Sequence, residues 1–128
     1  MSKKRVWIYC RTARPDTVCL AMQERYMISY AEEQGSTIAG VTSEHGSGLD
    51  FSRAGLKAVS NAIEEGKADA ILVKKLSRLG RDMEEMDVYL HWLKKHNAEV
   101  ICADGTVPML YTDLLHSLME KYLAEAAG

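Results

Sequence analysis

The sequence predicts one α/β domain in which a parallel sheet lies between two layers of helices. Short β-rich runs alternate with longer segments of helical periodicity, and the run Ala70–Val73 is apolar throughout, as in strands covered on both faces. This order implies a parallel sheet with helices on both faces. The length of 128 residues suits one domain, 1–128. We expect an α/β core over residues 1–105 and a C-terminal interface helix over residues 106–128.

Each element has its own local signal. The expected strands are rich in β-branched residues and are Val6–Cys10, Thr37–Thr42, Ala70–Val73 and Val100–Cys102. The expected helices carry apolar residues three and four positions apart and are Val18–Gln34, Ala54–Glu65, Asp82–His96 and about Leu110–Glu125. Asp16 or Thr17 is the expected cap of the first helix and Gly35 its stop.

The third helix carries a predicted core stripe of Met83, Met86, Leu90 and Leu93. Tyr89 and Trp92 lie off that stripe, so we expect them to be partly exposed and to mark a contact surface.

Three polar segments follow strands and are Arg11–Asp16, Ser43–Arg53 and Lys74–Arg81. Because the carboxyl ends of parallel strands meet at one edge of a sheet, we expect these segments to converge there. Residues 43–52 are polar and hold two glycines, which predicts a mobile loop. Residues 74–81 are expected to form a basic loop.

The basic segment contains Lys74, Lys75, Arg78 and Arg81, although the whole chain has a net charge of −2. With Arg11 and Arg53, four arginines can meet at the sheet edge. Guanidinium groups suit a phosphate, whose several oxygens need neutralising. The alternative for any one arginine is a solvated rim with ion pairs to neighbouring carboxylates. For the whole set at strand ends, we favour a phosphate site.

Other chemistries find little support in the composition. The three cysteines contain no CxxC pair, and we interpret them as reduced thiols of a cytoplasmic protein. The four histidines lack ligand spacing, so no metal is expected. The sequence HGSGLD lacks the third glycine of a dinucleotide loop. The apolar run before Arg11 is too short for a signal peptide or a membrane span.

Three stretches resemble the catalytic domain of the serine recombinases, the resolvase/invertase family. They are YCRTA at 9–13, SEHGSGLDFSRAGL at 43–56 and VKKLSRLGRD at 73–82. The resemblance covers about residues 5–104. It implies a resolvase-like fold and a serine that attacks a DNA phosphodiester and becomes joined to the 5′-phosphate, with no metal or cofactor. Several fixed guanidinium groups would then stabilise the transition state.

The resemblance also assigns roles residue by residue. Arg11, Arg78 and Arg81 match the principal arginine positions. Gln23, Ser47 and Arg53 match supporting polar positions, and Tyr9 matches the aromatic residue before the first arginine. Beside the resemblance, we expect Lys74 and Lys75 of the basic segment to support DNA binding.

The chain departs from the family pattern at three places. Ala13 stands at the position of the nucleophile, and a methyl group cannot attack phosphorus. Thr12 should point to the opposite side of the strand, and Ser47 does not match the nucleophile position. Ser77 stands where an aspartate usually precedes the first arginine. We expect no DNA-binding domain in this chain, because the last helix ends without arginines or a helix-turn-helix.

These departures predict a recombinase-type domain that is impaired in DNA cleavage. A laboratory substitution at Ala13 is one explanation, and the other two departures favour natural degeneration or an accessory role. Apolar residues cover more than one face of residues 110–123, which predicts a homodimer or tetramer built on that helix. One rival hypothesis is a non-enzymatic dimerising regulator that retains the fold. Another is a small-anion or nucleotide-binding protein of flavodoxin-like architecture.

Overall fold

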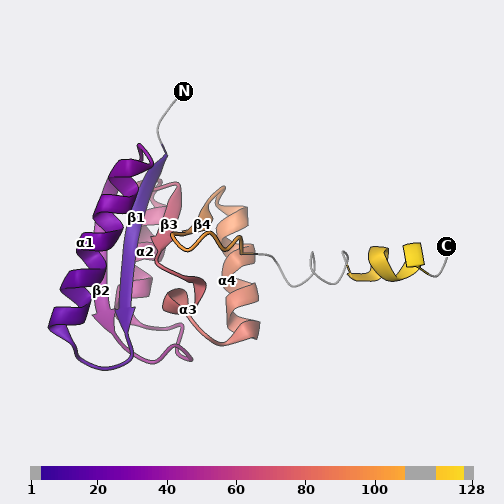
Figure 1. Cartoon of the computed structure of the whole chain (residues 1–128), viewed down its shortest axis with the longest axis horizontal. Coiled ribbons are helices and arrows are strands. Elements are labelled where there is room, and N and C mark those ends of the chain that lie inside the picture. The colour runs from indigo at the N-terminus through magenta and orange to yellow at the C-terminus, as the bar shows by residue number, and fades with distance from the viewer. Residues whose placement is uncertain (1–3, 109–117, 126–128) are drawn as a thin grey trace.

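The computed structural model describes residues 4–108 and 118–125 of the chain. Within these residues a parallel sheet has the strand order β2-β1-β3-β4 (Figure 1). The strands are β1 (Arg5–Thr12), β2 (Thr37–His45), β3 (Ala70–Val73) and β4 (Glu99–Cys102). The helices are α1 (Thr17–Glu33), α2 (Ala54–Glu64), α3 (Leu76–Leu79) and α4 (Met83–Lys95).

Two core clusters show how helices cover both faces of the sheet. On one face, Met27 and Ala31 of α1 pack with Ile8 and Leu72 of the central strands. On the other face, apolar residues of α2 and α4 pack with the alternate residues of the same strands, including Ile71. The predicted three-layer α/β/α architecture is therefore confirmed.

Local signals in the sequence explain how α1 begins and ends. The Asp16 carboxylate accepts a hydrogen bond from the Cys19 amide at 2.9 Å, as an N-cap does. Gly35 follows the helix with φ of 72°, a conformation that glycine adopts without steric cost. The chain then enters β2 directly, at Thr37.

The second strand is longer than its periodicity predicts. Residues 43–45 pair in register with Cys10, Arg11 and Thr12 of β1, so the expectation of a mobile loop from Ser43 was wrong for these residues. The sequence pattern did not indicate this part of β2, because the last residues of the strand are polar and belong to the site at the sheet edge instead of to the core.

The segment 74–81 is also more regular than the basic loop that was expected. Residues Leu76–Leu79 form the short helix α3, and Leu79 is completely buried. Gly80, the next residue, packs directly against Phe51. A Cβ atom at Gly80 would lie only 2.2 Å from the Phe51 ring.

The α4 stripe differs from the expectation at its first residue. Met83 is 76% exposed, whereas Met86 and Leu93 are buried. Tyr89 and Trp92 are partly exposed, as expected, and both also pack against the core of the α2–α4 layer. The Tyr89 hydroxyl also hydrogen-bonds to Ser60 at 2.7 Å. Helix α4 therefore contacts the core over a wider arc than one apolar stripe.

The predicted C-terminal helix falls partly outside the described residues, which omit 109–117. Residues 118–125 form an exposed helix. In the part of the chain that the structure describes, no helix is long and apolar enough to cross a membrane.

Candidate functional site

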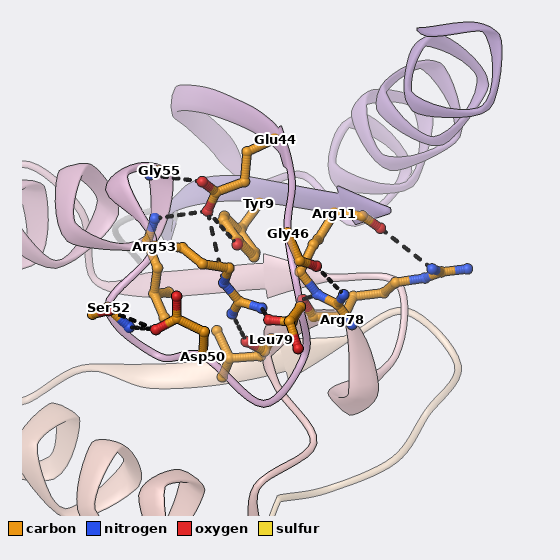
Figure 2. A network of polar contacts seen from close by, with 12 residues as sticks. Tyr9, Arg11, Glu44, Gly46, Asp50, Ser52, Arg53, Gly55, Arg78 and Leu79 are labelled. Atoms are coloured by element: carbon orange, nitrogen blue, oxygen red, sulfur yellow. Dashed lines mark hydrogen bonds and ion pairs between the residues drawn. The ribbon is translucent and has the colours of Figure 1, made fainter. Parts of the chain in front are cut away.

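The carboxyl ends of β1 and β2, the turn that follows β2, and α3 meet at one edge of the sheet (Figure 2). Tyr9 and Arg11 alternate with Ile8 and Cys10 along β1, so they face the α2 side while Ile8 and Cys10 join the α1 side. Arg11 is buried, with 2% of its surface exposed. Strand alternation therefore places the Arg11 guanidinium on the buried α2 side of the sheet, near the carboxyl end of β1.

Three backbone carbonyls hold the Arg11 guanidinium. Its Nη1 donates to Gly46 at 2.8 Å, its Nη2 to Ser77 at 2.6 Å and its Nε to Arg78 at 2.9 Å. Gln23 of α1 brackets the Arg11 backbone from the other face, accepting from its N–H at 3.2 Å and donating to its carbonyl at 3.4 Å. Arg11 thus joins the turn after β2 to α3.

A second buried arginine, Arg53, lies on the α2 side of the same turn. Its Nη1 donates to the Ser47 carbonyl at 2.9 Å, and its Nη2 donates to the Leu79 carbonyl. The guanidinium lies 5.7 Å from the centre of the Tyr9 ring, a cation–π arrangement. Its Nε has no hydrogen-bond partner among the described residues.

Glu44 is a site residue that the sequence analysis did not select. Its carboxylate accepts from the Tyr9 hydroxyl at 2.5 Å and from the Gly55 and Leu56 amides at 2.9 and 3.0 Å. It therefore caps the N-terminus of α2, where a negative charge is favourable. Its Oε2 also lies 3.9 Å from Nε of Arg53. The sequence did offer a signal for this role: Glu44 is a carboxylate near the end of a strand, and it lies ten residues before the first residue of α2.

Burial and hydrogen bonding perturb the groups beside Glu44. The pKa of the Tyr9 hydroxyl lies well above its ordinary range, first because it is buried and then because it donates to Glu44. Tyr9 therefore serves as a neutral donor. The pKa of Arg11 is lowered, first by burial and then by the nearby charge of Arg53, with smaller contributions from Arg78 and Arg81. Three other cations thus act on the Arg11 guanidinium at this edge of the sheet.

Arg78 and Arg81 are more accessible than the buried pair. Nη1 of Arg78 donates to the Arg11 carbonyl at 3.3 Å, and its Nε has no partner among the described residues. Figure 2 shows the guanidinium of Arg78 beyond the end of β1, away from that of Arg11. Arg81 is exposed, and its backbone amide donates to the Gly48 carbonyl at 2.6 Å. The structure therefore brings these arginines to one edge, where the guanidinium of Arg78 lies away from that of Arg11.

Ala13 lies just beyond the last residue of β1 and is exposed. The adjacent Thr12 hydroxyl is buried and donates to the Arg14 carbonyl at 2.6 Å, and the Ser47 hydroxyl accepts a hydrogen bond from the Leu49 amide at 3.1 Å. The two predicted lysines lie farther along the edge. Lys74 sits over the Tyr26 ring of α1 at 5.5 Å, and Lys75 is exposed.

Metal-ligating side chains do not gather at this edge. Over residues 4–108 and 118–125, no group of three or more histidine, cysteine or acidic side chains is arranged to hold a metal ion.

The sequence profile, together with this fold, identifies a catalytic domain of the site-specific recombinase class. The sequence profile described as the resolvase N-terminal domain matches residues 6–127. The chain therefore belongs to the resolvase family of serine recombinases.

Solved structures share this fold at low sequence identity. The N-terminal catalytic domain of TP901-1 integrase is 23% identical with a TM-score of 0.75, over 96% of this chain and 98% of that one. A resolvase-family site-specific recombinase from Streptococcus pneumoniae is 24% identical with a TM-score of 0.73, over 98% and 91% of the two chains.

The C-terminal catalytic domain of ISC1926 TnpA, an IS607-like serine recombinase, is 24% identical with a TM-score of 0.73 over 94% and 79% of the two chains. A comparison with curated protein sequences gives no significant match.

Proposed function

We propose that this chain binds DNA phosphates at the arginine edge of the sheet but does not form a phosphoserine link. The observation that carries the proposal is Ala13, which is exposed one residue beyond β1. The nucleophile of the family would stand there beside Arg11. Phosphoryl transfer requires a positioned nucleophile as well as charge stabilisation, so binding can persist after cleavage is lost.

The remaining charge at this edge supports phosphate binding. Arg53, Arg78 and Arg81 each lower the pKa of the Arg11 guanidinium, and the Glu44 carboxylate lies 3.9 Å from Nε of Arg53. Ser77, where the family usually has aspartate, adds no negative charge. The excess of positive charge favours an anion, and a DNA phosphate is the anion that resolvase-type domains act on.

A covalent-adduct assay tests the loss of cleavage. The chain and its Ala13→Ser variant are incubated with a nicked suicide DNA substrate, with a DNA-binding segment fused to both, and analysed by mass spectrometry. We expect no adduct on the parent chain. A DNA adduct on the parent would mean that another residue is the nucleophile and would refute the proposal.

The same assay separates the two explanations of Ala13. If only position 13 was altered, Ala13→Ser should form a 5′-phosphoserine adduct. If the site has degenerated further, the single variant stays inert, and the joint Ala13→Ser, Ser77→Asp variant is the one that can recover an adduct. Arg81→Met in the Ala13→Ser background is the matched control, since it keeps the hydroxyl and removes a guanidinium.

Salt dependence tests DNA binding itself. A domain that contacts phosphates loses affinity steeply as salt rises, with a slope of about −0.9 in log K against log salt for each phosphate neutralised. We expect the double variant Arg78→Met, Arg81→Met to show a shallower slope than the parent. Binding that is absent, or that does not respond to salt, would exclude a phosphate-binding role.

A second candidate function is a dimerising regulator that retains the fold. Its support is the helix of residues 118–125, in which Leu118, Met119, Tyr122 and Leu123 are 55–71% exposed. We propose that residues 106–128 are the interface segment beyond the 1–105 core, and that residues 110–123 join two or four copies. Leu118→Glu with Tyr122→Glu should give a monomer in light scattering, whereas a parent that is monomeric at high concentration would refute the interface.

A further inference from the structure

The strand β2 ends the sheet on one side, so its outer backbone edge is open within the described residues. We propose that this edge pairs in antiparallel orientation with the β2 edge of a second copy of the chain, so that two sheets join into one. The proposed contact uses neither the arginine edge nor residues 110–123. It therefore goes beyond the proposed function and stands independently of it.

The backbone groups of Val41 and Ser43 point away from the sheet. The Gly46 amide donates to the Thr12 carbonyl of β1 at 2.9 Å. Residues two apart in a strand direct their amides to the same neighbouring strand, so the Thr42 amide also bonds to β1. The amides and carbonyls of Val41 and Ser43 then face the open edge, where a further strand can pair with them.

This part of the edge lacks the features that usually prevent strand addition. Natural edge strands are protected by charged residues, proline or bulges. Residues 37–43 contain no charged residue and no proline, and the register shift of β2 lies nearer its amino end, before Gly40. The Ser43 hydroxyl donates to Glu24 of α1, so this polar side chain is turned toward its own helix and leaves the backbone edge accessible.

A partly exposed apolar face of α1 lies beside the edge. Glu24 accepts the hydrogen bond from Ser43, which fixes the side of α1 that faces β2. Leu20 and Ile28 lie four positions before and after Glu24, so they share its side of the helix. Both are only partly buried, and Val41 of the strand is 38% exposed. The apolar face therefore continues from the helix to the strand.

A second copy would cover this apolar face, whereas an isolated peptide strand would leave it open. Helix α1 contacts both β1 and β2, so it lies over the space between them. Because neighbouring strands are about 4.8 Å apart, two paired β2 strands would place the two α1 helices about 10 Å apart, and helices pack at about 8–10 Å. One two-fold contact thus pairs both backbone edges and brings Leu20 and Ile28 of the two copies together.

The β2 contact should be weak on its own. A pair of strands with little other support is marginal in water, so we expect the contact to form at high protein concentration and to be lost on dilution. Together with the proposed contact through residues 110–123, a second two-fold contact at β2 would give an assembly of four copies.

Amide hydrogen exchange followed by NMR measures the pairing directly. We expect the Val41 and Ser43 amides of the full chain to exchange about tenfold more slowly at high than at low protein concentration, because they gain hydrogen-bond acceptors in the second copy. The Thr42 amide bonds within the chain and should exchange at the same rate at both concentrations.

A charged edge residue tests the contact, and a matched substitution controls for the added charge. Val41→Lys places an ammonium on the edge and should abolish the concentration dependence at the Ser43 amide. Val18→Lys is the control, because Val18 is 69% exposed on α1. It shares a side of the helix with Tyr26, which contacts Lys74 beyond β3, and so lies away from β2. This control should keep the concentration dependence of the parent.

The variant Leu118→Glu with Tyr122→Glu separates the β2 contact from the proposed contact through residues 110–123. The concentration dependence at the Ser43 amide should persist in this variant. Its loss would mean that the protection comes through residues 110–123, and it would overturn the pairing of β2.

Two further results would overturn the inference. Exchange at Val41 that is fast at every concentration would show that the edge stays open. Slow exchange at every concentration, in the parent and in Val41→Lys alike, would show that the chain covers the edge by itself. The Thr42 amide reports whether each variant is folded, and Leu20→Lys, on the α1 side of the contact, replaces Val41→Lys if that variant does not fold.

Discussion

Replacing Glu44 with alanine tests the polar network that joins β1, β2 and α2. The substitution removes the acceptor of the Tyr9 hydroxyl and the cap of the Gly55 and Leu56 amides. It also removes the carboxylate 3.9 Å from Nε of Arg53. The Glu44 side chain is 15% exposed, so solvent replaces these contacts only in part.

The expected loss follows from the separate contacts. A lost N-cap costs about 0.5–2 kcal/mol, and a buried hydroxyl left without its acceptor costs about 1–3 kcal/mol. Because these terms share one carboxylate and do not add fully, we expect the free energy of unfolding to fall by about 2–4 kcal/mol. For a domain of this size, that corresponds to a decrease in Tm of roughly 7–15 °C.

Urea unfolding followed by circular dichroism measures this change. Glu64→Ala, at an exposed position in α2, is the matched control and should cost less than about 0.5 kcal/mol. Tyr9→Phe completes a double-mutant cycle with Glu44→Ala, in which we expect a coupling of about 1 kcal/mol. A loss below about 0.5 kcal/mol for Glu44→Ala, or a coupling of zero, would refute the network.

Two further predictions concern titratable groups. Burial raises the pKa of the Cys10 and Cys102 thiols to about 11, so both should resist a disulfide reagent at pH 8 until the chain unfolds; prompt labelling of either in the folded protein would contradict this. Hydrogen bonds from Arg5 hold the pKa of Asp69 in the folded protein below its ordinary value. The pair therefore stabilises the fold at pH values above the pKa of Asp69 in the unfolded chain. This stabilisation is lost as the pH falls through the pKa of Asp69 in the folded protein. The Asp69→Asn variant should therefore lose stability less steeply on acidification than the parent, and equal acid limbs in pH-dependent unfolding would show that this exposed pair contributes nothing.

The period of apolar residues was sufficient to predict the architecture. Alternation places Tyr9 and Arg11 on one side of β1, and helical spacing places Met27 and Ala31 of α1 against the sheet. Such patterns depend only on local geometry, which repeats every two residues in a strand and every 3.6 in a helix. The convergence of the three polar segments followed as well, because parallel strands all end at one edge.

Side-chain chemistry at position 13 is also a property of the sequence alone. No fold can give Ala13 a hydroxyl, so the expected loss of phosphoserine formation does not depend on geometry. The start and end of α1 at Asp16 and Gly35 were likewise predictable from the sequence alone, since each residue acts on the backbone within one helical turn.

Only the tertiary structure decided how the charged groups are used. Glu44 pairs in register with Arg11 across β1 and β2, yet its carboxylate reaches Tyr9 and the start of α2. Strand alternation sets the side of β1 on which Arg11 lies, but only the path of the turn at Gly46 covers its guanidinium and leaves Arg81 exposed. Hydrogen-bond partners far apart in the chain depend on strand register and on the path of each turn. These are set by the packing of the whole sheet and not by neighbouring residues.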